Sequence, residues 1–128
     1  MALNHLNLTV PDVTRTREFF ETYFGFRCLT PSTARGPDTL AVLVDESGFI
    51  LSLNNFERAN EVEYPGAFHI GFMQQSREQV DAMYQRLKSD GFEVKPPREF
   101  HGGWTFYFHA PGGFLVEVLH QPGSKRVS

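Results

Sequence analysis

The sequence has a single cysteine, Cys28, among 128 residues, which excludes a framework of disulfide bonds. No apolar run approaches the roughly 20 residues that a membrane-spanning helix needs, so no membrane partner is expected. The 12 lysines and arginines form no basic stripe against the 15 acidic residues, so nucleic acid is not an expected partner either. The first residues lack a basic segment followed by an apolar one, which predicts no signal peptide and a cytoplasmic location.

Phenylalanine, by contrast, is abundant, with 13 copies against four tyrosines and one tryptophan. Aromatic side chains carry a large apolar area each, so they can fill a small core or line an apolar pocket. A chain of this length suits one compact domain with a true hydrophobic core. Cys28 ends an aromatic segment, which favours a buried structural thiol over a nucleophile.

The second half of the chain repeats the first. HLNL at 5–8, GF at 25–26 and GFILSL at 48–53 each have a counterpart 64 to 66 residues later. The counterparts are HIGF at 69–72, GF at 91–92 and GFLVEV at 113–118. We therefore predict one domain over residues 1–128, built from two modules at about 1–58 and 64–121, with a short C-terminal tail.

Each module has the pattern of a strand, a helix and three further strands. In the first module, apolar and polar residues alternate from His5 to Val10, and a helix is expected between Asp12 and Gly25. In the second, Ser76 and Gln79 form a capping-box pattern. The other strands are predicted at 26–30, 40–45, 48–54, 92–95, 104–109 and 113–120. The fold class is thus α+β, with two tandem βαβββ modules whose helices lie outside and whose open sheet faces form a cup.

Three ionisable residues are out of register with their apolar neighbours. His5 and His69 occupy equivalent positions in the two modules, and Glu117 is the counterpart of Ser52. Each alone is adequately explained as a satisfied core or surface residue. Together, two imidazoles and one carboxylate on the cup side form a facial metal site with open positions for water or substrate. We therefore predict one divalent ion, of iron, manganese, zinc, nickel or cobalt, bound by His5, His69 and Glu117.

Two stretches carry a resemblance to a known family. HLNLTVPD at 5–12, followed by two phenylalanines and GF, and FYFHAPGGFLVE at 106–117 resemble the vicinal oxygen chelate superfamily. That superfamily includes glyoxalase I, thiol transferases that inactivate fosfomycin, extradiol dioxygenases, epimerases and metal-free bleomycin-binding proteins. The resemblance implies the tandem fold, a small-molecule substrate and a homodimer, in which many members complete each cup with modules from two chains.

Comparison with the ligand positions of each class reduces the number of classes that this chain could belong to. Glyoxalase I uses four protein ligands, whereas Ser52 is a poor ligand in the matching place, and bleomycin-binding proteins generally lack the ligand set. Fosfomycin thiol transferases use two histidines and one glutamate and resemble this chain at Tyr107, but their serine-rich basic segment is not evident at 96–105. Extradiol dioxygenases share the triad and the tyrosine. Their further histidine is not matched, because His101 is about one residue too close, and their second-sphere histidine falls near Asn54 or Asn55, which are not acids or bases of that kind.

We therefore expect a metal-dependent enzyme for a small oxygen-containing substrate, with redox-neutral chemistry of the lyase, isomerase or thiol-transferase type. Glu117 and Tyr107 are the expected catalytic residues, Tyr107 as donor of a hydrogen bond or proton. The predicted substrate pocket consists of Asn7, Thr9, Ser52, Asn54, Met73 and His109. The alternatives are a ring-cleaving dioxygenase, a non-catalytic drug-binding protein and a degenerate protein with residual ligands. Substrate identity depends on the loops at 30–40, 54–66 and 95–103.

Overall fold

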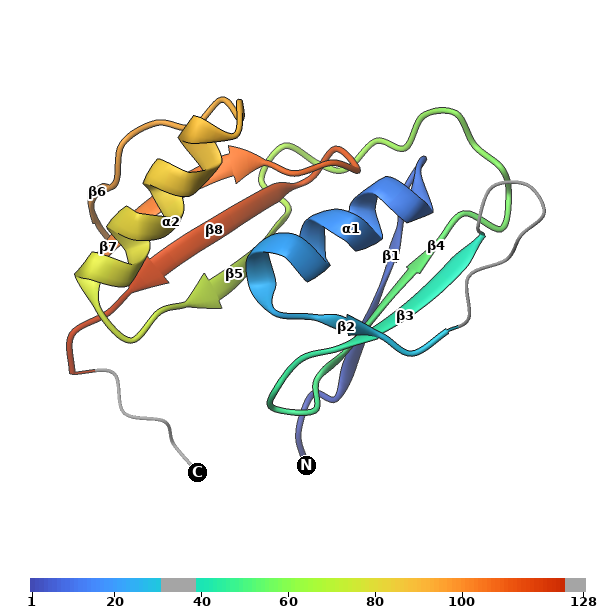
Figure 1. Ribbon diagram of the computed structural model, residues 1–128, viewed down its shortest axis with the longest axis horizontal. Helices are drawn as coiled ribbons and strands as arrows, with labels where there is room; N and C mark the ends of the chain where they lie inside the picture. Colours follow the sequence, from blue (N-terminus) through green and yellow to red (C-terminus); the bar gives the residue numbers. More distant parts are fainter. Residues whose placement is uncertain (31–38, 124–128) are drawn as a thin grey trace. The chain divides into compact units, whose positions relative to one another are not determined.

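The computed structural model describes residues 1–30 and 39–123, which form two four-stranded sheets and two helices (Figure 1). The first half contains β1 (His5–Thr9), α1 (Val13–Phe24), β2 (Arg27–Cys28), β3 (Leu40–Val44) and β4 (Ile50–Asn54). The second contains β5 (His69–Met73), α2 (Arg77–Ser89), β6 (Arg98–Phe100), β7 (Gly103–His109) and β8 (Leu115–His120). The predicted α+β class and the βαβββ order of each module are confirmed.

The two sheets have the same topology. Their strand orders are β1-β4-β3-β2 and β5-β8-β7-β6, with the first pair parallel and the other two pairs antiparallel in each. The chain divides into two compact units, residues 1–64 with 110–113 and residues 65–109 with 114–123 of the described chain. The internal repeat therefore corresponds to a repeated sheet.

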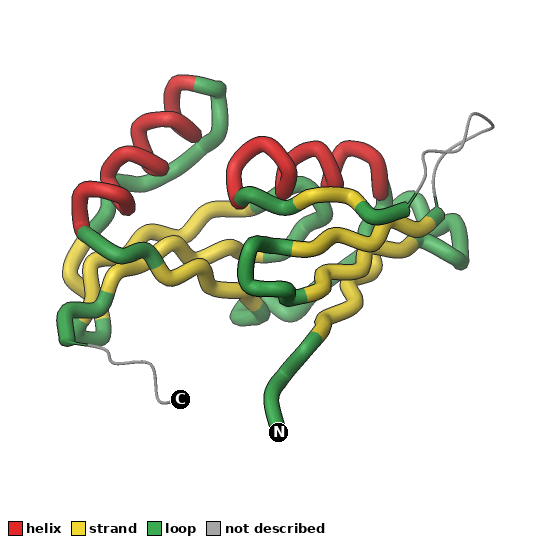
Figure 2. Tube along the Cα trace, turned by 60° about the horizontal axis from the view of Figure 1, so that its bottom comes forward, coloured by secondary structure: helices red, strands yellow, loops and turns green. Residues whose placement is uncertain are grey.

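In the first unit, α1 covers one face of the sheet (Figure 2). Asp12 caps the helix by accepting the N–H of Arg15, and Gly25 ends it in the left-handed region at φ 70°. Both caps agree with the sequence prediction. The core between helix and sheet consists of Leu8, Val10, Val13, Phe19, Phe20, Phe26, Ala41, Leu43, Leu51 and Leu53.

In the second unit, α2 covers the sheet in the same way. Ser76 accepts the N–H of Gln79, but the Gln79 side chain accepts the N–H of Gln75 rather than that of Ser76, so the capping box is only half formed. The helix ends at Ser89, Asp90 is its C-cap, and Gly91 follows at φ 94°. The core consists of Val80, Tyr84, Leu87, Phe106, Phe108, Phe114, Val116 and Val118.

The strand predicted at 92–95 is wrong. The strand that pairs with β7 is β6, and residues 92–97 form no strand. Arg98 pairs with Thr105, so an extension of this antiparallel pairing toward the N-terminus of β6 would place Pro96 opposite Tyr107. Proline has no backbone N–H to donate to a neighbouring strand. His101 and Gly102 both adopt positive φ, 50° and 76°, which suits a two-residue hairpin turn beside β6.

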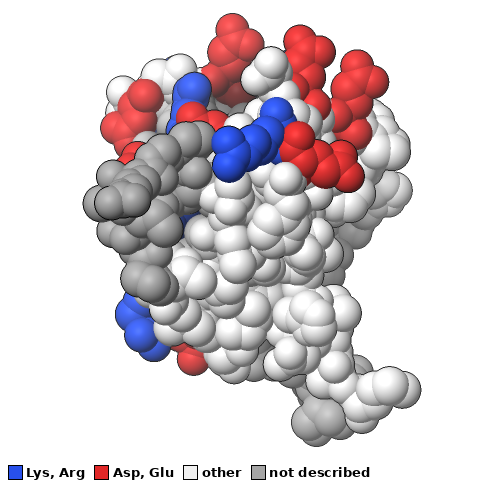
Figure 3. All heavy atoms as spheres, turned by 90° about the vertical axis from the view of Figure 1, so that its right-hand side faces the viewer, with Lys and Arg blue, Asp and Glu red and all other residues white. Residues whose placement is uncertain are grey.

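Cys28 also differs from the prediction, because it is half-buried rather than buried. Its Sγ lies 3.3 Å from the Thr30 hydroxyl oxygen. Within the described ranges, no helix is long and apolar enough to cross a membrane. On the face drawn in Figure 3, acidic and basic side chains stand beside one another, so the charges there are mixed.

Candidate metal centre

The open face of the second sheet carries a row of polar residues across three strands. Glu117 on β8 pairs with Gly71 on β5 and with Tyr107 on β7, and cross-strand partners share a face of a sheet. His69 lies two residues before Gly71 and therefore on the same face. The strand register thus brings His69, Glu117 and Tyr107 together, away from α2.

His69 and Glu117 face each other through two potential ligand atoms. The Nε2 atom of His69 lies 3.5 Å from Oε1 of Glu117, and the two side chains are 41% and 14% exposed. The Nδ1 atom of His69 lies 3.0 Å from the carbonyl oxygen of Ala67. A carbonyl only accepts, so Nδ1 carries a proton and Nε2 is the atom left for a ligand or a second proton. Two acceptor atoms at this separation can both contact one bound cation.

The separation fits a metal ion. Imidazole nitrogen and carboxylate oxygen bind zinc at about 2.0–2.2 Å, so two ligands of one ion lie at most roughly 4.2 Å apart. The observed 3.5 Å satisfies this limit. Gly71 contributes no side chain here, and a Cβ at its position would lie 3.6 Å from Oε1 of Glu117. A side chain at position 71 would therefore be in van der Waals contact with that oxygen.

Thr105 orients the glutamate from the other side. Its hydroxyl lies 3.0 Å from Oε2 of Glu117 and 3.1 Å from the carbonyl oxygen of Val118, and the residue is 1% exposed. By donating to Oε2, Thr105 holds the carboxylate with Oε1 toward His69. Alternation along β7 puts Thr105 on the face of Tyr107, but it does not reveal this contact, because the contact depends on the β7–β8 register.

Tyr107 completes the cluster. Its ring meets the His69 ring edge-on, with 5.6 Å between centroids. Burial raises the pKa of Tyr107, and a hydrogen bond to Glu117 and the negative charge of that carboxylate raise it further, against an opposite effect of the Arg98 charge. The phenol is therefore protonated at neutral pH.

The third predicted ligand, His5, belongs to the first unit. It is exposed at the start of β1, with Nδ1 3.3 Å from Oδ1 of Asn4. Among the described residues, no group of three or more histidine, cysteine, aspartate or glutamate side chains comes together to hold a metal ion. The structure thus brings His69 and Glu117 together within one unit, and the three-ligand set remains a prediction.

The first sheet presents the polar residues of the predicted pocket. Ser52 pairs with Asn7, and Asn54 donates to Oδ1 of Asn7 at 2.7 Å and to the carbonyl of Leu8 at 3.3 Å. Thr9 is exposed, and its carbonyl accepts from the hydroxyl of Tyr64. This face therefore offers amides and hydroxyls, with no carboxylate among its described strand residues.

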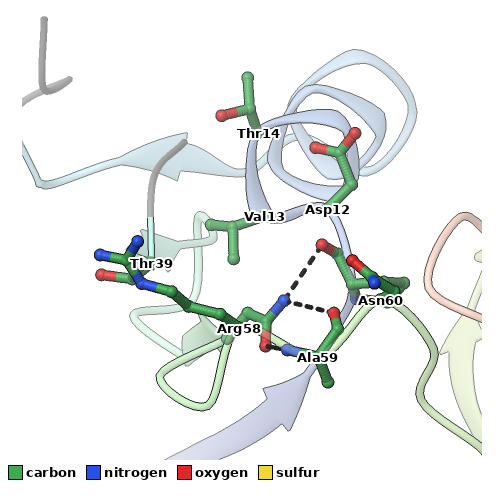
Figure 4. Close-up of a pocket in the computed structure, with 9 residues that line it drawn as sticks. Asp12, Val13, Thr14, Thr39, Arg58, Ala59 and Asn60 are labelled. Atoms are coloured by element: carbon green, nitrogen blue, oxygen red, sulfur yellow. Dashed lines mark hydrogen bonds between the residues drawn. The ribbon is translucent and has the colours of Figure 1, made fainter. Parts of the chain in front are cut away.

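The neighbouring Asn55 has a structural role. Its side chain donates to the carbonyls of Pro11 and Ala59 and accepts the N–H of Ala59, which closes a loop below α1 (Figure 4). The loop borders a cavity of about 300 Å³ whose charged lining residues are Asp12 and Arg58. Asp12 already caps the helix, so this cavity offers no free set of metal ligands among the residues described.

The remaining candidates are dispersed over the second unit. Met73 is 51% exposed, and His109 is exposed at the end of β7 on the face of Tyr107. The Nδ1 atom of His120 lies 3.0 Å from the carbonyl oxygen of Gln74, which supports leaving His120 out of the site. The Trp104 Nε1–H donates to Asp81 on α2.

Comparison with known proteins identifies the family of this chain. Residues 2–118 match the model of the glyoxalase/bleomycin resistance protein/dioxygenase superfamily, and the chain belongs to that superfamily. It is similar to the structure of a possible glyoxalase from Bacillus cereus, with 53% identity over 93% of this chain and 98% of the other, at a TM-score of 0.79. It is also 31% identical to the fosfomycin resistance protein FosX of Listeria innocua, over 91% of this chain and 86% of the relative.

A third relative informs the fold alone. A mutant of FosX from Listeria monocytogenes, in complex with manganese(II) and 1S,2S-dihydroxypropylphosphonic acid, is 24% identical. The match covers 98% of this chain and 96% of that one, at a TM-score of 0.76. The two chains therefore share the fold.

Proposed function

We propose that this protein is a metal-dependent enzyme that carries out redox-neutral chemistry on a small oxygen-containing substrate. His69 and Glu117 supply two ligands, and His5 supplies the third from the same chain or from a second copy. The observation that carries the proposal is the opposition of two acceptor atoms, Nε2 of His69 and Oε1 of Glu117, at 3.5 Å. A bound divalent ion would supply Lewis acidity toward a substrate oxygen.

The surrounding residues support this role. The carbonyl of Ala67 fixes the ring orientation of His69, and the hydroxyl of Thr105 fixes the carboxylate of Glu117. Tyr107 holds its proton on the same face and can donate it, or a hydrogen bond, to a substrate oxygen that becomes negative during the reaction. The proposed further pocket residues are Asn7, Thr9, Ser52, Asn54, Met73 and His109.

The proposal favours redox-neutral chemistry over ring cleavage for a structural reason. The side-chain amide of Asn54, where the resemblance to dioxygenases would call for a histidine, already donates to Asn7 and Leu8. It offers no proton acceptor of the imidazole kind. Tyr107 is then the principal group for substrate protons, and one such group suffices for addition or isomerisation at a polarised oxygen.

The ligand set is tested by metal binding. We expect elemental analysis of gently purified protein to find a divalent metal, and His5→Ala, His69→Ala and Glu117→Gln each to weaken its binding strongly in calorimetric titration. His120→Ala is the matched control, because this histidine is on the opposite face of β8 and bonds to a backbone carbonyl. Tight stoichiometric binding that survives all three ligand changes would place the site elsewhere. Purified protein that neither contains nor binds metal would favour the drug-binding alternative.

The reaction class is tested separately. Tyr107→Phe should lower turnover in a panel of thiol-addition, hydration and isomerisation substrates much more than it lowers metal affinity. Oxygen uptake with catechol by the iron-loaded protein, at a rate typical of enzymes, would instead establish the dioxygenase alternative.

We also propose a homodimer in the cytoplasm. The family and the single half-buried cysteine support these two assignments. Mixing His5→Ala with Glu117→Gln distinguishes a shared site from one within a chain, because only subunits that share a site restore one intact ligand set. A strict monomer in small-angle scattering at micromolar concentration would exclude the shared site.

A further inference from the structure

The second unit contains a cavity of about 550 Å³ beside the edge of β7. Its lining residues come from the end of α2, from the segment that follows it, and from β7 and β8. One of them is Tyr107, which pairs across β7 and β8 with Glu117 of the proposed metal centre. The volume is within the range of about 300–1,000 Å³ that is usual for small-molecule sites.

The two prolines at 96–97 account for the open edge of the strand beside this cavity. β6 pairs with β7 only as far as Arg98 and Thr105, whereas β7 continues to His109. The segment 92–95 approaches β7 through a ring contact between Phe92 and Phe108, with centroids 6.1 Å apart, but it forms no strand. The space between this segment and the edge of β7 is therefore not closed by a hydrogen-bonded ladder.

The lining divides into an apolar part and a polar part. Phe92 and Val94 are half-buried, while Glu93 and Lys95, which alternate with them, are exposed. Phe108 and Leu115 add apolar surface, and Tyr107 and His109 add polar groups on the face of the metal centre. A ligand that fits this lining has an apolar body and a polar end.

The charges indicate the sign of that polar end. The lining contains two lysines and one glutamate. The ammonium of Lys88 lies 5.8 Å from the centre of the Tyr84 ring, whereas Lys95 forms no ion pair with any carboxylate in the described part of the chain. Lys88 is not ion-paired in that part of the chain either, so both lysines favour an anion, and Lys95 is the one without the ring contact.

We propose that this cavity binds a small carboxylic acid with an aromatic or branched apolar body, and that the ammonium of Lys95 recognises the carboxylate. In combination with the proposed function, on which this step rests, the cavity defines the substrate class and places such an acid beside Tyr107. Binding of the acid itself needs no metal, because Lys95 and the apolar lining are contributed by the protein.

The test uses phenylacetate as the probe and the full chain, before and after metal removal by a chelator. We expect phenylacetate to bind the metal-free protein in calorimetric titration, with resonances of His109 and Leu115 shifting in the NMR spectrum. Lys95→Gln should weaken binding about fivefold to tenfold, the effect of an exposed ion pair of roughly 1 kcal/mol. Lys95→Arg should restore most of it, and uncharged phenylacetamide should bind wild type and Lys95→Gln equally.

Two further variants guard the interpretation. Arg27→Gln removes the same charge from β2 in the first unit and should leave phenylacetate binding unchanged. Val94→Trp should fill the cavity and abolish binding of both probes, with the fold checked by circular dichroism. Absence of phenylacetate binding to wild type, or equal binding by wild type and Lys95→Gln, would overturn the proposal.

The same titrations separate this inference from the proposed function. His69→Ala should lose metal and retain phenylacetate, which supports the acid site independently of the metal. If the protein binds phenylacetate through Lys95 but binds no metal, the proposed function fails and the acid site remains. Phenylacetate binding that appears only after metal loading and is insensitive to Lys95→Gln would assign the carboxylate to the metal and overturn the acid site.

Discussion

Replacing Thr105 by valine removes the hydrogen bond that orients the Glu117 carboxylate and leaves Glu117 itself in place. The hydroxyl of Thr105 has one proton, which it donates to Oε2 of Glu117 at 3.0 Å or to the carbonyl of Val118 at 3.1 Å. Valine has nearly the same shape, so a residue that is 1% exposed keeps its packing and loses only this donor. The change leaves both predicted ligands of the second unit, His69 and Glu117, in place.

The expected magnitudes follow from the charge of the acceptor. A hydrogen bond to a charged group contributes about 1.5–3 kcal/mol and one between neutral groups about 0.5–1.5 kcal/mol. Since the proton of Thr105 is shared between a charged and a neutral acceptor, Thr105→Val should lower the free energy of unfolding by about 1–2 kcal/mol. Loss of a residue that orients a metal ligand typically weakens metal binding about 10-fold to 100-fold.

The assay combines urea denaturation of the metal-free protein with calorimetric titration of manganese and zinc. Thr16→Val is the matched control, because Thr16 is fully buried in the first unit and its hydroxyl donates to the carbonyl of Asp12 at 2.7 Å. It should lower stability by about 0.5–1.5 kcal/mol and leave metal affinity unchanged. Equal metal affinities for Thr105→Val and wild type, with the expected loss of stability, would refute the role of Thr105 in orienting a ligand.

Three further predictions concern the fold. Phe20 is fully buried among other aromatic rings, so Phe20→Ala should lower the free energy of unfolding by about 3–5 kcal/mol in urea denaturation. Phe56 is 62% exposed, so Phe56→Ala should change it by less than about 0.5 kcal/mol. Burial opposes ionisation of Asp45, but hydrogen bonds from the Ser47 hydroxyl and from the backbone of Phe49, Ser47 and Gly48 outweigh it and lower the pKa below 3.8. The charge of Asp45 therefore stabilises the fold above about pH 4. The difference in free energy of unfolding between wild type and Asp45→Asn should disappear as the pH falls through the lowered pKa. A difference that grows in acid would contradict the predicted direction of this pH dependence. Gly102→Ala should destabilise the protein by about 1–2 kcal/mol, because the backbone at this position is left-handed, at φ 76°. No atom lies within 4 Å of the new Cβ, so the cost comes from the backbone conformation and not from a clash. An unchanged melting temperature would show that the turn adopts another conformation.

The sequence by itself determined the tandem βαβββ fold and the faces of its strands. Alternation of apolar and polar residues is a local property, and it correctly placed His69 and Glu117 on the side opposite Val116 and Val118. The helix caps at Asp12 and Gly25 are equally local, since each depends on atoms within one turn of the chain.

Only the tertiary structure decided which of these residues meet. The hydrogen bond from Thr105 to Glu117 and the position of Tyr107 beside them depend on the register of two strands, which alternation within one strand does not specify. The same holds for β6, which the sequence pattern placed at 92–95 by analogy with the first module. Pro96 cannot continue the ladder with β7, so pairing begins at Arg98, and the edge of β7 beyond it stays open beside the cavity that Lys95 lines.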